Sequence, residues 1–253
     1  MKSPAFRFAP FAAISLSLAA GWGSAQAAIV TTLPTSALDA NTTFSFSSTA
    51  SGAMSLLGIS AKALGTSTNV DGNAWSFNMP VTEVTISTSL LPLSISPVSG
   101  KATGAALGIN GASGSLILAN FALDFQRNVM TGDLITSAGT TKGVDLYNFH
   151  VADGLSLSTS GGLSLKMSMD QMYLTSTARA SFVSALKLPS FTDAVMAQLD
   201  FGQMMVEISP ALRLGVSGKA FTGTVAVPEA PSLAMMVLGM LGVAWVSRRS
   251  QRR

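Results

Sequence analysis

His150 is the only histidine in a chain of 253 residues that contains no cysteine. A serine triad or an imidazole base would have to use His150, and no Gly-x-Ser-x-Gly turn surrounds any serine. In an expected strand at 146–151, His150 points away from the face that carries Tyr147 and Phe149. We interpret it as a surface histidine, and we predict no catalytic residue.

Carboxylate pairs are the other catalytic chemistry to weigh, because glycosidases place two of them beside the scissile bond. Asp124 and Asp133 are expected across one hairpin, and Asp145 and Asp153 across the next. Asp133 and Asp153 each adjoin a glycine, where an aspartate typically bonds the backbone of its own turn. The pattern favours structural turns, so the chain is predicted not to be an enzyme.

A ligand site is the remaining chemistry. Tyr147, His150 and Tyr173 are the candidates for contacting a haem or a glycan, since a phenolate or an imidazole can ligate haem iron. A tyrosine within a strand is nevertheless more typical of a core or its rim. We therefore predict no resident cofactor and keep ligand binding as an alternative function.

Metal ligands are sparse in this sequence. Asp71 and Asn73 offer oxygen atoms but lack the regular series and the distal glutamate of a calcium loop. Without accompanying histidines to form a copper site, the later methionines are expected to fill the core: Met167, Met169, Met204 and Met205. No metal site is predicted.

The elements that must position these residues are mainly strands. The clearest alternation places four apolar side chains on one face: Leu163, Leu165, Met167 and Met169. Turn signals recur between such runs, at Asp71–Gly72, Gly100, Asn110–Gly111, Gly132–Asp133, Asp153–Gly154 and Gly161–Gly162.

Helical spacing occurs late in the chain, from residue 176 to Pro189 and again over 191–199, and strands are expected to return at 203–208 and 212–216. Residues 28–226 are therefore predicted to form an all-β domain. We expect an antiparallel sandwich or flattened barrel with two short late helices.

Composition and charge exclude several classes of protein. Hydrophobic residues make up 48% of the chain and charged residues only 11%, which excludes a long disordered protein. All of the excess basic charge lies at the two ends, because residues 28–226 carry nine Lys or Arg and eleven Asp or Glu. A weakly acidic body has no basic face to neutralise phosphates, so nucleic-acid binding is not expected.

Residues 1–27 have the three parts of a secretory signal peptide. Lys2 and Arg7 form the basic start, residues 8–20 form a largely apolar stretch, and Ala25 and Ala27 provide the small residues of a cleavage site. We predict cleavage by signal peptidase after Ala27. The alternative is an anchor helix, which the short apolar stretch disfavours.

Residues 227–253 form a second organised segment. A proline-bearing motif comes first: Val227, Pro228, Glu229, Ala230 and Pro231. A transmembrane helix is predicted over 232–246 and a basic tail over 247–253, with these anchor and stop residues: Leu233, Leu238, Leu241, Trp245, Arg248 and Arg249. Fifteen helical residues span about 22 Å against a hydrocarbon core of roughly 30 Å, so the anchor is expected to be transient.

This order of parts resembles the PEP-CTERM sorting signal of exported Gram-negative proteins, over residues 227–253 alone. Ala230 stands where the usual motif has its second proline, so the cleavage position stays open. The resemblance implies a precursor anchored in the inner membrane, facing the periplasm, and an exosortase-like protease that releases the mature form to the cell surface or the extracellular matrix.

From these observations we expect a non-catalytic surface protein associated with exopolysaccharide in a biofilm. The alternatives are an extracytoplasmic module that binds haem or a glycan, and an ordinary tail-anchored protein. The sequence names no ligand or matrix partner.

Overall fold

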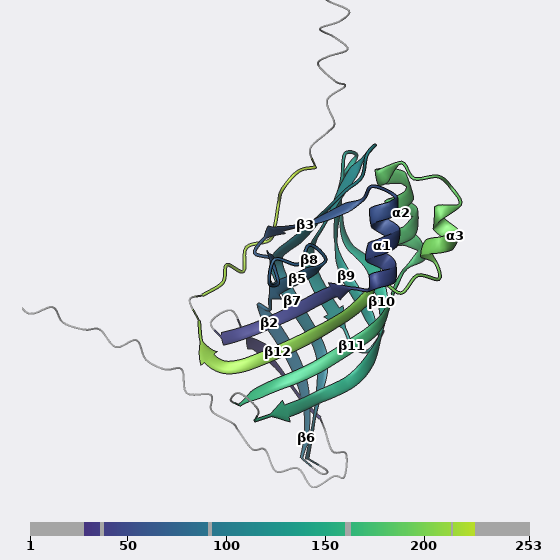
Figure 1. Cartoon of the computed structure of the whole chain (residues 1–253). Coiled ribbons are helices and arrows are strands. Elements are labelled where there is room, and N and C mark those ends of the chain that lie inside the picture. Colours follow the sequence, from purple (N-terminus) through teal and green to yellow (C-terminus); the bar gives the residue numbers. More distant parts are fainter. Residues whose placement is uncertain (1–27, 36–37, 91–92, 160–162, 214, 226–253) are drawn as a thin grey trace, which may run out of the picture.

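A single antiparallel sheet of twelve strands curves into a half-barrel in the computed structural model, with three helices at one end (Figure 1). The structure describes residues 28–225 except 36–37, 91–92, 160–162 and 214. The helices are α1 (Ser48–Leu56), α2 (Ser176–Leu186) and α3 (Thr192–Met196). The all-β class is confirmed.

The strands alternate with short turns for most of the chain. The first six are β1 (Ile29–Pro34), β2 (Leu38–Phe46), β3 (Ser60–Gly65), β4 (Thr68–Asn69), β5 (Ser76–Pro80) and β6 (Glu83–Leu90). The last six are β7 (Leu93–Asn110), β8 (Ser115–Asp124), β9 (Val129–Thr136), β10 (Gly139–Ser158), β11 (Ser164–Leu174) and β12 (Gly202–Leu212).

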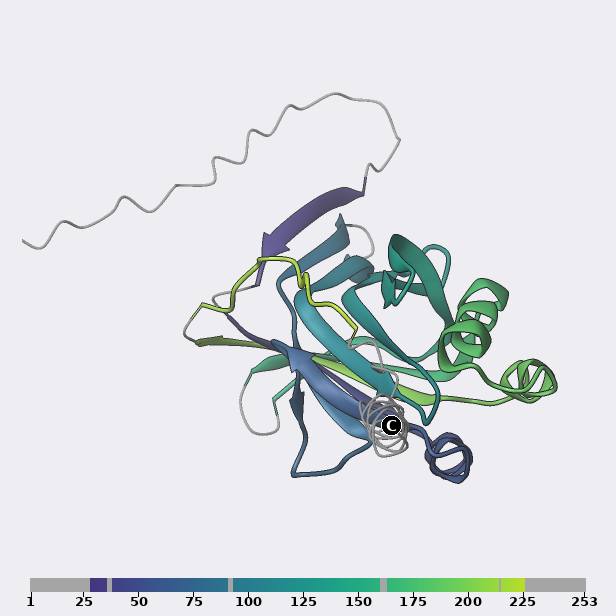
Figure 2. The same ribbon diagram turned by 90° about the horizontal axis from the view of Figure 1, so that it is seen from above.

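The sheet order is β1-β6-β7-β8-β9-β10-β11-β12-β2-β5-β4, and β3 pairs with β7 beside this path. One half of β7 therefore pairs with β6 and the other half with β3, and Gly104, with a φ of 86°, lies just before the β3-paired half. Seen from above, β1 lies on the opposite side of the molecule from the three helices (Figure 2). The helices thus close one end of the half-barrel only.

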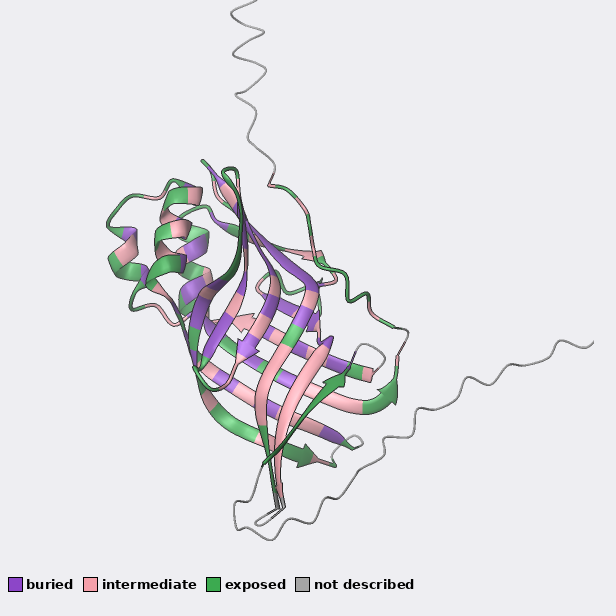
Figure 3. Ribbon diagram, turned by 180° about the vertical axis from the view of Figure 1, so that it is seen from behind, coloured by how far each residue is buried: buried purple, intermediate pink, exposed green. Residues whose placement is uncertain are grey.

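The core fills the concave side of the sheet. Buried positions alternate with partly exposed ones along most strands, as period-2 packing requires, whereas all of β1 is exposed (Figure 3). Aromatic rings meet near the helices, where the Tyr147 ring centroid lies 5.9 Å from that of Phe44 and 5.7 Å from that of Phe201. This cluster lies within one continuous core that joins the sheet to the three helices.

The two late helices are where the spacing predicts them, but α1 was not predicted. Only Ala50 and Met54 of α1 are buried, so its sequence carries no apolar stripe wide enough to indicate a helix. Its start is fixed by Ser47, whose hydroxyl accepts the N–H of Ala50 at 3.0 Å. Within the described ranges, three helices accompany the sheet where two were predicted.

Several predicted turns were wrong because their glycines lie inside long strands. Gly100 is in β7, Gly132 is in β9, and Asp153 with Gly154 lies at register shifts within β10. A Cβ atom at Gly132 would come within 2.8 Å of Leu146 Cδ1, so this glycine serves close packing between β9 and β10. Asp145 and Asp153 consequently share one strand instead of facing each other across a hairpin.

Two strand predictions also need correction. In the run from Leu163, Met167 and Met169 are buried as expected. Leu165, near the start of β11, is only partly buried, and Leu163, which precedes that strand, is exposed. Of the strand expected at 212–216, only Leu212 is in a strand, as the last residue of β12, and the described residues 213, 215 and 216 are not. Within the part of the chain that the structure describes, no helix has the length and apolarity to cross a membrane.

Candidate functional site

An apolar cavity of about 220 Å³ lies at the helical end of the half-barrel. Helix α1 contributes Met54 and Leu56, and the segment from α2 to β12 contributes most of the opposite side. The remaining lining residues are Ala53, Leu57, Ile59, Ile109, Phe182, Leu186, Leu188, Phe191, Thr192, Val195, Met196, Leu199 and Phe201. We call this space the helix-end cavity.

The helix-end cavity has a buried floor and an exposed rim. Ile109, Phe182 and Phe201 are buried at the floor, where the helices meet the sheet. At the rim, by contrast, Leu56 is 91% exposed and Phe191 is 66% exposed. Large apolar side chains grouped around an opening mark a surface that another apolar group can cover.

The cavity offers a ligand almost no polar contact. Thr192 is the one lining residue with a polar side chain, and its Oγ1 already donates to the Pro189 carbonyl at 2.7 Å. The lining contains no ionisable side chain. A polar molecule would therefore lose hydrogen bonds to water without replacement, which favours an apolar ligand.

Local hydrogen bonds fix where α2 begins and how α3 packs against it beside the cavity. Thr175 caps α2 by accepting the Ala178 N–H, and Lys187 ends that helix in the left-handed conformation with a φ of 54°. Arg179 of α2 donates from Nε to Asp193 of α3 at 3.1 Å and from Nη1 to the Leu174 carbonyl. These contacts hold α3, and with it the rim, against α2.

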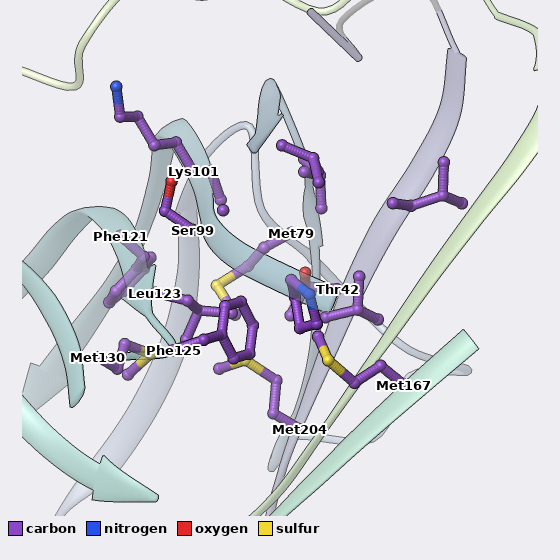
Figure 4. Close-up of a pocket in the computed structure, with 17 residues that line it drawn as sticks. Thr42, Met79, Ser99, Lys101, Phe121, Leu123, Phe125, Met130, Met167 and Met204 are labelled. Carbon is purple, nitrogen blue, oxygen red and sulfur yellow. The ribbon is translucent and has the colours of Figure 1, made fainter. Parts of the chain in front are cut away.

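A second apolar pocket lies within the half-barrel away from the helices. Four methionines labelled in Figure 4, Met79, Met130, Met167 and Met204, line this pocket around the ring of Phe125. Its volume is only about 40 Å³, so the flexible methionines already fill most of it. We interpret this space as core packing. Met167, Met169 and Met204 are buried as predicted, whereas the prediction was wrong for Met205, which is exposed on the outer face.

The three residues predicted for a ligand site do not line the helix-end cavity. Tyr147 is fully buried between the sheet and the helices, and this burial raises the pKa of its phenol far above the ordinary value. His150 and Tyr173 lie on the outer face of β10 and β11, where His150 Nδ1 is 2.9 Å from Asp170 Oδ1. The sheet itself therefore separates these two residues from Tyr147, which lies on its inner side.

The carboxylates considered for catalysis form structural contacts instead. Arg127 lies between two of these carboxylates: its Nε is 2.7 Å from Asp124, and its Nη1 is 3.1 Å from Asp145. The guanidinium lowers the pKa of Asp124. Asp133 accepts from Asn120 Nδ2 and from the Gly143 N–H. Asp153 accepts from the Ser168 hydroxyl.

Among the described residues, no three His, Cys, Asp or Glu side chains are grouped to hold a metal ion.

The predicted sorting residues lie outside the described residues. This holds for the signal cleavage site at Ala25 and Ala27 and for the whole segment 227–253. The lining residues of the helix-end cavity were not predicted as a site, because apolar side chains at helical spacing equally indicate an ordinary core. The helical repeat of Phe191, Val195 and Leu199 was the available signal.

Comparison with known proteins gives two partial structural similarities. No protein-family model and no curated protein matches the chain. The C-terminal domain of HtaA from Corynebacterium glutamicum aligns with a TM-score of 0.43 and 13% identity, over 68% of this chain and 96% of that one. The haem-binding protein HtaB from the same organism aligns with a TM-score of 0.41 and 13% identity, over 74% and 98%. At these TM-scores the similarities assign no ligand to this chain.

Proposed function

We propose that residues 28–225 form a ligand-binding module that takes an apolar molecule into the helix-end cavity. The observation that carries this proposal is the exposed apolar rim of Leu56, Phe191 and Val195 around an opening without free hydrogen-bonding groups. Each Å² of apolar surface removed from water contributes about 25 cal/mol to the free energy of binding. Covering the rim therefore favours an apolar ligand, and a lining without ionisable groups supports binding rather than catalysis.

The size of the ligand follows from the cavity. Its volume of about 220 Å³ is below the roughly 300–1,000 Å³ of ordinary small-molecule sites, so a larger ligand would be inserted in part and covered by the rim. A glycan does not suit this cavity, because its hydroxyls would find no partners there. A flat or extended apolar molecule does.

Haem is one such molecule, and the cavity residues allow a test of how it would bind. Met54 and Met196 are the lining residues whose side chains can ligate iron, whereas Tyr147, His150 and Tyr173 are elsewhere. The cavity therefore suits the apolar faces of a porphyrin better than its metal. We expect haem and metal-free protoporphyrin IX to bind with similar affinity.

The test is a titration of the full-length protein in detergent with haem and with protoporphyrin IX, followed by absorbance and porphyrin fluorescence. Replacing Phe191 by Ser should weaken both ligands about tenfold, since burial of one large apolar side chain contributes about 1.5–3 kcal/mol. Leu157→Ser is the matched control, because Leu157 of β10 is 64% exposed and does not line the cavity.

Two results would contradict the proposal. Equal weakening by Phe191→Ser and Leu157→Ser would show that the ligand does not occupy the cavity. Haem that binds far more tightly than protoporphyrin IX, and loses this advantage in His150→Ala, would place the site on the outer face of the sheet.

We further propose that this module is exported and sorted. Support comes from the signal peptide at 1–27 and from the order of motif, apolar run and arginines in 227–253. Cleavage after Ala27 would leave every residue of β1 intact, because that strand begins at Ile29. The proposed partners are signal peptidase, an exosortase-like protease, the inner membrane and the exopolysaccharide of the cell surface.

A further inference from the structure

A polar groove of about 580 Å³ crosses the outer face of the sheet over β12, β2, β5 and β4. It extends toward the ends of β2 and β12 that are distant from the helices, where Asp39 pairs with Ser209. One wall contains Asp71, in the turn between β4 and β5, and the other contains Leu163, before β11. The groove is thus separate from the helix-end cavity.

Strand register explains why the floor of this groove is polar. Met205 of β12 pairs with Thr43 of β2, which pairs with Asn78 of β5, so their side chains form one row on the outer face. Two residues further along β12 and β2, Glu207 pairs with Asn41. Because side chains alternate between faces, these rows place hydroxyl, amide and carboxylate groups side by side.

Two side chains of the groove lack the hydrogen bonds that their burial requires. Ser164 is only 5% exposed, and its Oγ finds no partner among the described residues. The same holds for Oδ1 of Asn78, across the groove from it. A buried polar group left unpaired costs about 1–3 kcal/mol, so both atoms favour a ligand that brings hydrogen bonds.

Two of the three carboxylates that line the groove, Glu207 and Asp39, already have partners, and the third, Asp71, is exposed to water. Glu207 lies 3.1 Å from the Lys166 ammonium, and Asp39 accepts from Asn41 Nδ2 at 2.7 Å. Arg213 donates to Asn41 Oδ1 at 3.0 Å. Among the described residues no three His, Cys, Asp or Glu side chains are grouped to hold a metal ion, and the carboxylates that line the groove would repel an anion, so a neutral ligand fits better than either.

We propose that this groove binds a neutral polysaccharide. Sugar hydroxyls both donate and accept, which matches the unpaired Ser164 and Asn78 and the exposed carboxylate of Asp71. Because Ser164 Oγ is closed to water in the free protein, the proposed complex includes a rotation about the Cα–Cβ bond that turns this hydroxyl toward the ligand. The exposed side chains of Met205 and Leu163 supply apolar surface for the C–H face of a sugar ring.

The test is affinity electrophoresis of the full-length protein in detergent through gels that contain dextran, galactomannan or xylan. Wild type should be retarded by at least one of the three. Ser164→Ala should reduce that retardation about fivefold, the effect of one lost hydrogen bond, while leaving the melting temperature unchanged or higher because an unpaired buried hydroxyl is removed. Asp71→Asn, in an exposed turn, should weaken retardation by a similar factor.

Two control variants test whether the polysaccharide occupies the groove itself. Ser168→Ala changes a serine of the same strand outside the groove and should be retarded like wild type, as should the rim variant Phe191→Ser. Retardation by none of the neutral gels overturns the proposal, as does equal loss in Ser164→Ala and Ser168→Ala. Stronger retardation by the anionic polymer alginate, or calcium binding lost in Asp71→Asn, would also overturn it in favour of a charged ligand.

Discussion

The hydroxyl of Ser47 donates to the main-chain carbonyl of Asp200 at 2.7 Å while it accepts the N–H of Ala50 at 3.0 Å. The N–H of Ser47 also donates to the carbonyl of Phe201 at 2.9 Å. Ser47 therefore caps α1 and also connects this helix, through hydrogen bonds, to Asp200 and Phe201 just before β12. Because Phe201 lies in the lining of the helix-end cavity, this junction fixes α1 relative to that lining.

Replacing Ser47 by Ala should lower the free energy of unfolding by about 1–2 kcal/mol, since a helix cap and a hydrogen bond are lost together. Urea denaturation followed by circular dichroism measures the change. Ser48→Ala, at an exposed position of the same helix, should stay within about 0.5 kcal/mol of wild type. Similar losses in the two variants would show that the junction does not stabilise the domain.

Met169→Ala should lower the free energy of unfolding by about 2–5 kcal/mol, because Met169 is completely buried and its truncation leaves a cavity. Met205→Ala is the matched control on the neighbouring strand, where the side chain is largely exposed and the expected change is within about 0.5 kcal/mol. Thermal and urea melts of both variants test the inward and outward assignment of β11 and β12. The assignment would be wrong if Met205→Ala were the more damaging change.

The contact between Arg127 and Asp124 should make stability depend on acid pH. Because the guanidinium holds the pKa of Asp124 below its ordinary value of 3.8, the folded chain binds this proton less readily than the unfolded chain does. The stabilisation is present above that value and is lost as the pH falls through the lower folded pKa. An NMR titration of the Asp124 carboxyl carbon should show its pKa rising toward 3.8 in Arg127→Gln.

Arg127→Gln should also flatten the dependence of unfolding free energy on pH below about pH 4, where the wild-type contact is lost by protonation. An unchanged Asp124 titration in this variant would mean that the pKa is lowered by the backbone alone. Lys142→Gln, which changes a cation outside this contact, serves as the control.

Mass spectrometry of the secreted or surface fraction should find a mature chain that begins near Ala28 and lacks the arginine tail. The reason is that residues 1–27 and 227–253 each carry the sequence features of a processing signal. An intact Arg253 in that fraction would refute sorting by cleavage. Substituting Pro228 and Glu229 should leave the precursor in the inner membrane.

Sequence periodicity predicted the class of fold because alternation reports directly which side of a strand is buried. It failed where glycine has a role other than turning the chain. Gly132 allows β9 to approach Leu146, and Gly154 lies in a stretch of β10 with shifted register, so neither ends a strand. These roles depend on a neighbouring strand that a local pattern cannot reveal.

The site was harder to predict than the fold. Met54, Phe182 and Phe201 belong to three separate segments, and they meet only because β12 pairs with β2 next to α1. The polar candidates, by contrast, were visible in the sequence, but Tyr147 is buried in the core, and His150 and Tyr173 lie on the outer face. Apolar residues that line a cavity have the same sequence pattern as apolar residues that fill a core.

The position of β2 in the sheet constrains the order of folding and transport. Among the described strands it is the second in chain order, yet one of its two neighbours is β12, the last of them. β2 cannot be fully paired until residues 202–212 are present, and such long-range pairing is slow to form. In a chain that crosses a membrane from its N-terminus, the half-barrel would close only once nearly the whole domain has emerged.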